Sequence, residues 1–98
     1  MTYIAGRYYS NTITTSASGQ DLISTIKTTL GVSRVTARKI DLICSGSICV
    51  DIGNTGVWSP LHTDATGSYT LHLDEDNVFA NSIKILESGR DVFIGIIY

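Results

Sequence analysis

The chain has 98 residues, of which 43% are hydrophobic and 16% charged, with a net charge of −2. This length suits one domain with a core of its own, and the composition excludes a disordered chain. The weak, slightly acidic charge provides no field that would hold a polyanion, so nucleic-acid binding is not expected.

Targeting signals are not evident in the sequence. The N-terminal stretch MTYIAGRYYSNTITT lacks the apolar core of a signal peptide, and no apolar run approaches the roughly twenty residues of a membrane span. We therefore expect the chain to stay in the cytosol unless something carries it out, with no membrane partner.

Residues 1–19 differ from the rest of the chain because they combine tyrosines with a Ser/Thr-rich tract. Such a segment has too little apolar surface to fold alone, yet some of its side chains are poor candidates for full exposure to water: Tyr3, Ile4, Tyr8 and Tyr9. We interpret it as an N-terminal arm that docks on its own domain or on a neighbouring chain. A frayed tail is the alternative.

One short helix is predicted over Gln20–Leu30. Its apolar positions have helical spacing: Leu22, Ile23, Ile26 and Leu30. Ser18 or Gly19 could cap its start, and Gly31 could end it. A strand is the alternative, but it would leave Ile23 on the polar side.

After Gly31 the pattern is that of β-structure, with turn residues about every eight to twelve positions. Pro60, near the end of a strand, indicates a sheet edge. We therefore predict a mainly β fold, an antiparallel β-sandwich or jelly roll with one helix, formed by residues 20–98. The predicted strands are Arg34–Cys44, Ile48–Ile52, Val57–Leu61, Ser68–Leu73, Ser82–Leu86 and Asp91–Tyr98.

The run ARKIDLICSGSICVDIG predicts a hairpin that turns at Ser45–Ser47. The expected cross-strand pairs are Ile40 with Ile52, Leu42 with Val50, and Cys44 with Ile48. In this register Cys49 lies on the opposite face from Cys44, so free thiols are expected rather than a disulfide. The cysteine spacing also fits no zinc site.

Residues 82–98, SIKILESGRDVFIGIIY, predict a second hairpin whose final strand is apolar on both faces. Such a strand lies inside a sheet or beneath a neighbour. Gly95 would allow a close approach, and the second face could meet the helix, the N-terminal arm or another subunit.

Candidate chemical groups are few, and each has a simpler structural explanation. The acidic segment Asp74–Asn77 lacks a calcium-loop pattern and is typical of a solvated turn. Asp41 and Asp51 would face each other across the first hairpin, where an acid and base pair is one hypothesis. His62 and His72 are expected at the surface, with no nucleophile placed beside them.

Trp58 and Tyr69 are candidate stacking residues for a sugar ring. A lone tryptophan in a sandwich is also a common core residue. If the two rings are instead exposed, they would favour the alternative function, a carbohydrate or host-receptor binding module.

The order of parts resembles small virion proteins of tailed bacteriophages over most of the chain from residue 21 onward. The resemblance rests on the aromatic N-terminus, the helix at DLISTIKTTLGV, the strand TARKIDLI, the segment VDIGNTGVWSPL and the ending SIKILESGRDVFIGIIY. It implies a compact β domain built into the head, neck or tail, without a reaction centre, signal peptide or disulfide.

The resemblance further implies a non-enzymatic virion subunit, assembled in the host bacterial cytoplasm and partnered by other capsid, neck or tail proteins. We expect a capsid auxiliary or decoration role, a homo-oligomer and no cofactor. An arm that adds a strand to a neighbouring sheet tolerates a Ser/Thr-rich sequence, because backbone groups make the bonds. The expected assembly residues are Tyr3, Ile4, Tyr8, Tyr9, Phe93, Ile97 and Tyr98.

Overall fold

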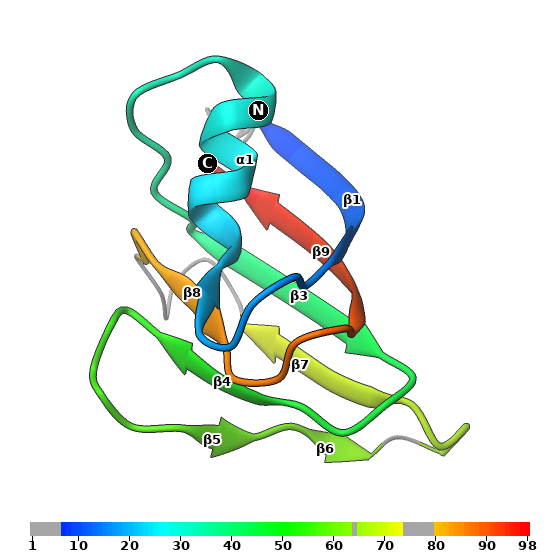
Figure 1. Cartoon of the computed structure of the whole chain (residues 1–98). Helices are drawn as coiled ribbons and strands as arrows, with labels where there is room; N and C mark the ends of the chain where they lie inside the picture. Colours follow the sequence, from blue (N-terminus) through cyan, green and yellow to red (C-terminus); the bar gives the residue numbers. More distant parts are fainter. Residues whose placement is uncertain (1–6, 64, 74–79) are drawn as a thin grey trace, which may run out of the picture.

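The structure is a computed structural model that describes residues 7–63, 65–73 and 80–98 (Figure 1). One helix, α1, spans Leu22–Leu30. The strands are β1 (Tyr8–Thr14), β2 (Gln20–Asp21), β3 (Lys39–Cys44), β4 (Cys49–Ile52), β5 (Ser59–Pro60), β6 (His62–Thr63), β7 (Tyr69–Leu73), β8 (Ile83–Ile85) and β9 (Asp91–Ile97).

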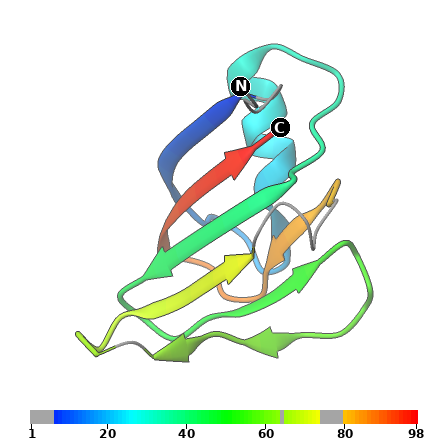
Figure 2. The ribbon, with the colours of Figure 1, turned by 180° about the vertical axis from the view of Figure 1, so that it is seen from behind.

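The strands form two antiparallel sheets packed into a β-sandwich, which confirms the predicted fold class. The five-stranded sheet has the order β1-β9-β3-β7-β6, and the four-stranded sheet has the order β2-β8-β4-β5. Figure 2 shows the larger sheet from behind, with β1 at its edge. Pro60 lies on β5, an edge strand as predicted, where a missing N–H costs no ladder bond.

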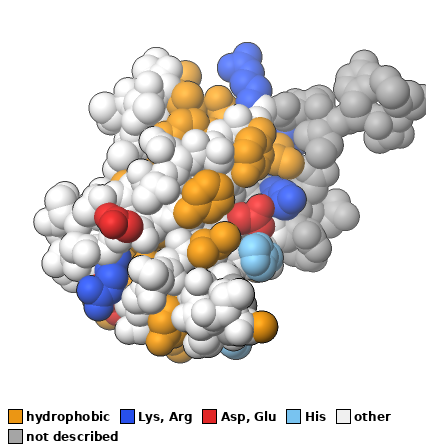
Figure 3. Space-filling model, turned by 90° about the vertical axis from the view of Figure 1, so that its right-hand side faces the viewer, with side chains coloured by type: hydrophobic (Ala, Val, Ile, Leu, Met, Phe, Trp, Pro, Cys, Tyr) orange, Lys and Arg blue, Asp and Glu red, His pale blue; other side chains and the backbone are white. Residues whose placement is uncertain are grey.

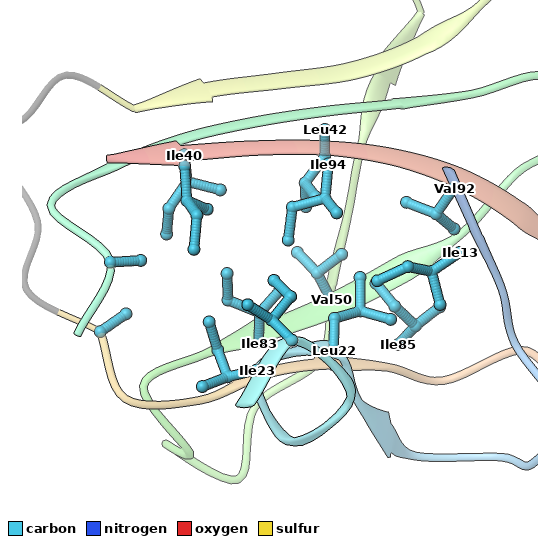
Figure 4. Packing of buried hydrophobic residues seen from close by; sticks show 14 of the residues in the cluster. Ile13, Leu22, Ile23, Ile40, Leu42, Val50, Ile83, Ile85, Val92 and Ile94 are labelled. Carbon is cyan, nitrogen blue, oxygen red and sulfur yellow. The ribbon is translucent and has the colours of Figure 1, made fainter. Parts of the chain in front are cut away.

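A single aliphatic core fills the space between the sheets. Figure 4 shows side chains from β3 and β9 meeting those from β4, β8 and the helix. The residues with no exposed surface include Leu22, Ile26, Ile40, Leu42, Ile83, Ile85, Val92, Ile94 and Ile96. Branched aliphatic side chains suit this core because they pack closely between the pleated surfaces of the two facing sheets.

The helix is confirmed, but its start is two residues later than Gln20 and its cap is neither Ser18 nor Gly19. Asp21 is the cap: its carboxylate accepts a hydrogen bond from the N–H of Ile23 at 3.0 Å. The same oxygen accepts from the N–H of Ile83 on β8 at 3.1 Å. One carboxylate therefore starts the helix and ties it to the smaller sheet.

Both predicted hairpins are wrong. β3 pairs with β7 and β9, whereas β4 pairs with β5 and β8, so Ser45–Ser47 carries the chain from one sheet to the other. The pairs Ile40 with Ile52 and Leu42 with Val50 therefore do not form as strand neighbours. β8 and β9 likewise belong to different sheets. These connections are corners of the sandwich rather than tight hairpin turns.

The corners meet at one end of the sandwich around Thr15, which is 1% exposed. Its hydroxyl donates to the carbonyl of Glu87 at 2.9 Å and accepts from the N–H of Arg90 at 2.9 Å. The Glu87 carboxylate accepts from the N–H of Cys49, and the Arg90 side chain donates to the carbonyl of Ser47. One polar network therefore joins three connections that run from one sheet to the other: β1 to β2, β3 to β4, and β8 to β9.

Residues 8–14 of the expected N-terminal arm form β1, which pairs along its whole length with β9 of the same chain. The sequence left open whether the arm docks on its own domain or on a neighbouring chain. Residues 8–14 dock on their own domain. Ile13 points inward and is 7% exposed, so β1 also contributes to the core. Tyr3 and Ile4 lie outside the described residues.

Candidate functional site

The candidate site is the outer face of the five-stranded sheet, the side that turns away from the core. Alternation along β9 sends Val92, Ile94 and Ile96 inward, where none of them is exposed. Phe93 and Ile97 point outward and are half-buried. The expectation that β9 is apolar on both faces and lies inside a sheet is confirmed, since β1 and β3 flank it.

Four outward side chains from three adjacent strands form an outer-face patch, defined as Tyr8, Ile43, Phe93 and Ile97. Tyr8 on β1 lies opposite Ile97, and Ile43 on β3 lies opposite Phe93. Tyr8 is 60% exposed and Ile43 is 39% exposed. Figure 3 shows hydrophobic side chains gathered on this side of the molecule, next to charged groups and a histidine.

Gly95 lies in the middle of this face and is covered by the Tyr8 side chain. A Cβ atom built at Gly95 would lie 2.5 Å from the Tyr8 hydroxyl oxygen, which is far too close for any other residue without movement of the ring. The close approach expected at Gly95 therefore exists, and the segment that makes it is the N-terminal one. Glycine in a central strand is costly, and a ring laid across it restores lost packing.

Charged residues border the patch on the side of β7. Asp41 lies opposite His72, and its carboxylate is 2.8 Å from Nδ1 of the imidazole. Lys39 places its ammonium 3.9 Å from the other oxygen of Asp41. The His72 side chain is 61% exposed, as predicted for a surface histidine, so these solvent-exposed polar contacts contribute little to stability. They give the apolar patch a polar rim.

Asp51 does not face Asp41, which corrects the predicted acid and base pair: the two lie on different sheets. Asp51 is 4% exposed and accepts hydrogen bonds from the N–H groups of Thr55 and Gly56 at 2.7 and 2.9 Å. The bond from the Thr55 N–H lowers the pKa of Asp51 below 3.8, and burial only partly opposes it. Asp51 therefore holds the loop after β4 in place.

Replacing Asp51 by asparagine should lower the melting temperature at neutral pH, because the amide accepts the loop N–H groups less strongly than a carboxylate. A lowered native pKa stabilises the fold above pH 3.8, and this contribution is lost as the pH falls through the native pKa. The difference in melting temperature between wild type and Asp51→Asn should therefore become smaller below about pH 4. Asp91→Asn, at an exposed position, is the control. A difference in melting temperature that grows in acid would contradict the assigned role of the Asp51 carboxylate.

Of the other residues predicted for assembly, Tyr9 and Tyr98 are half-buried and pack against the core rather than joining the patch. Ile43 was missed by sequence reasoning, because the predicted hairpin paired β3 with the wrong neighbour. The outward position of Ile43 between Leu42 and Cys44 was the available signal. Strand alternation identifies such a residue only when the neighbouring strands are known.

The alternative stacking residues are not on this face. Trp58 is 37% exposed and precedes β5 in the smaller sheet, whereas Tyr69 lies on β7 and packs against the core. The acidic segment Asp74–Asn77 lies outside the described residues. His62 is exposed on β6, as predicted.

A second apolar feature is a groove of about 400 Å³ between the two sheets, which the sequence did not indicate. It is lined by Val50, Ile52, Thr55, Val57, Ser59, Leu71 and Leu73.

Comparisons with family models, with curated proteins and with solved structures found no match to this chain. Within the described ranges, no helix is both long and apolar enough to cross a membrane. The described residues also contain no group of three or more side chains suited to hold a metal ion. Cys44 and Cys49 are both free thiols, as predicted.

Proposed function

We propose that the protein is a non-enzymatic structural subunit of a phage virion, a capsid auxiliary or decoration protein that docks on other virion proteins through the outer-face patch. The observation that carries the docking role is the grouping of Tyr8, Ile43, Phe93 and Ile97 on one solvent-facing side of the sheet. The virion setting rests on the resemblance in the order of sequence elements.

The chemistry of the patch supports a protein partner. Apolar side chains at its centre gain about 25 cal/mol for each Å² removed from water. The rim of Lys39, Asp41 and His72 can select the orientation of a partner without adding much affinity. A rigid central strand carries Phe93 and Ile97, so little conformational entropy is lost on docking.

Particle occupancy tests this proposal. Ile43→Lys should remove the protein from purified particles, because it places an ammonium within the apolar contact. Val32→Lys is the matched control: Val32 lies past the helix end and is 40% exposed, against 39% for Ile43. The measurement is the amount of the protein per major capsid protein by mass spectrometry. A wild-type chain absent from the particles, or equal loss for both variants, would refute the proposal.

The alternative is a carbohydrate or host-receptor binding module of a phage tail or fibre, favoured by the exposed ring of Trp58 beside Val57, which is 64% exposed. Trp58→Ala should then abolish a glycan-array signal while circular dichroism stays unchanged, because the ring supplies the stacking surface. Phe93→Lys is the control, since it lies on the other sheet. A wild-type chain that binds no glycan would remove this alternative.

A further inference from the structure

One edge of the five-stranded sheet is the long strand β1, which among the described strands is hydrogen-bonded to β9 alone. Arg7 and Tyr98 exchange two backbone hydrogen bonds of 3.0 and 2.8 Å, which fixes the phase of the ladder between β1 and β9. Hydrogen-bonded pairs alternate along an antiparallel ladder. The backbone N–H and C=O groups of alternate residues therefore point away from β9; these residues are Tyr8, Ser10, Thr12 and Thr14.

The composition of β1 leaves this edge open to pairing. Natural edge strands are kept apart by shortness, proline, lysine or bulges. Among the described strands, the other edges β2, β5 and β6 have two residues each, and β5 contains Pro60. β1 has seven residues, YYSNTIT, without charge or proline. Within the described part of the chain, the outward Thr12 N–H is protected by the side chain of Asn11, which accepts it at 2.8 Å.

We propose that two copies of this chain pair through β1, antiparallel, about a two-fold axis at Asn11. In this register Tyr8 faces Thr14 of the second copy and Ser10 faces its Thr12, so every outward backbone group is bonded. Asn11 faces Asn11 of the second copy. Its side chain gives up the hydrogen bond from the Thr12 N–H, which then bonds to the backbone of the second strand. The isologous contact closes after two copies, because each contributes the same strand.

The chemistry of β1 favours a second copy over another partner. The outward groups are spaced evenly about the central residue, so an antiparallel copy satisfies all of them. The facing side chains are uncharged, with hydroxyls opposite hydroxyls at Ser10 and Thr12, so no like charges meet. The paired sheets also place both outer-face patches on the same side, which would give a bivalent docking surface.

A charge exchange at Asn11 tests the pairing on the full chain by sedimentation velocity. Asn11→Lys and Asn11→Glu each place like charges face to face, and each should weaken the dimer by about tenfold or more. An equimolar mixture should regain the dimer, because opposite charges then face each other. Asn11 is exposed, so both variants should keep the wild-type circular dichroism spectrum. A wild-type chain that stays monomeric, or single variants that dimerise undiminished, would overturn the proposal.

Disulfide trapping tests the register independently. Facing residues of a non-hydrogen-bonded antiparallel pair have Cα atoms about 4.5 Å apart, within disulfide reach. Asn11→Cys should therefore form a covalent dimer on non-reducing gels, whereas Ser10→Cys, which faces Thr12, should not. The wild type shows the background from Cys44 and Cys49. Crosslinking through Ser10→Cys, or none through Asn11→Cys, would overturn the register. Dimerisation is measured without particles, so its failure is distinct from failure of the virion proposal.

Discussion

Replacing Ile94 by lysine should prevent the chain from folding, whereas Phe93→Lys should fold and lose the docking activity. The two residues are neighbours on β9, but Ile94 points into the core with 0% exposure and Phe93 points outward. An unpaired ammonium in an aliphatic core costs more than about 4 kcal/mol, a large part of the stability of a small domain. At Phe93 the charge reaches water on its flexible stem, and the expected cost is about 1 kcal/mol.

Circular dichroism and thermal melts of the two variants measure the first effect, and particle occupancy measures the second. Val32→Lys supplies the matched control, because Val32 is 40% exposed past the helix end and lies away from the outer face. Equal stability of the Ile94 and Phe93 variants would mean that the two faces of β9 have been assigned wrongly. Full occupancy of folded Phe93→Lys in particles would exclude the patch as the docking surface.

Deleting residues 1–14 should remove cooperative folding or lower the melting temperature by more than about 12 °C, the shift that corresponds to roughly 3 kcal/mol in a domain of this size. The deletion removes a seven-residue ladder with β9 and the buried side chain of Ile13. It also exposes one edge of a strand that is apolar on both faces. An arm that merely rests on the surface would instead be lost with little effect.

Point variants separate the two contributions of this strand. Ile13→Ala should cost about 2–4 kcal/mol because it empties part of the core, while Thr12→Ala, on the exposed face, should cost well under 1 kcal/mol. Scanning calorimetry of the four proteins gives the comparison. A truncated chain that melts within a few degrees of the full chain would show that β1 is dispensable.

Local patterns predicted the fold class and the helix because both depend on spacing within a short window. Leu22, Ile23 and Ile26 mark a helical face whatever the rest of the chain does, and all three are buried. Alternation along β9 likewise predicted a strand that is apolar on both faces and lies inside a sheet. These features are set by contacts that each segment must make with some apolar layer.

Strand partners could not be predicted in the same way. Ser45–Ser47 and the residues after β8 contain the small and polar residues of hairpin turns, yet both connections cross between the sheets. A tight turn and a sandwich corner both need a flexible, polar linker, so composition does not separate them. The decisive groups are distant: Thr15 and Arg90 hold the corners together across the chain.

The candidate site could be predicted only in part, because its residues come together through strand pairings that the sequence did not indicate. Tyr8, Phe93 and Ile97 were predicted for assembly as apolar residues without an obvious place in the core, and they lie together on the outer face. Ile43 joined them only once the pairing of β3 with β9 was known. Tyr9 and Tyr98 had the same composition signal, but alternation turns Tyr9 toward the core side.

The pairing of β1 with β9 has a consequence for synthesis of the protein on the ribosome. Thr14 and Asp91, joined through their side chains, are 77 positions apart in the chain. The larger sheet therefore lacks β9 until residues 91–97 emerge, and until then β1 lacks the one partner it has among the described strands. Contacts between such distant segments form slowly, so the nascent chain depends on late closure rather than stepwise growth.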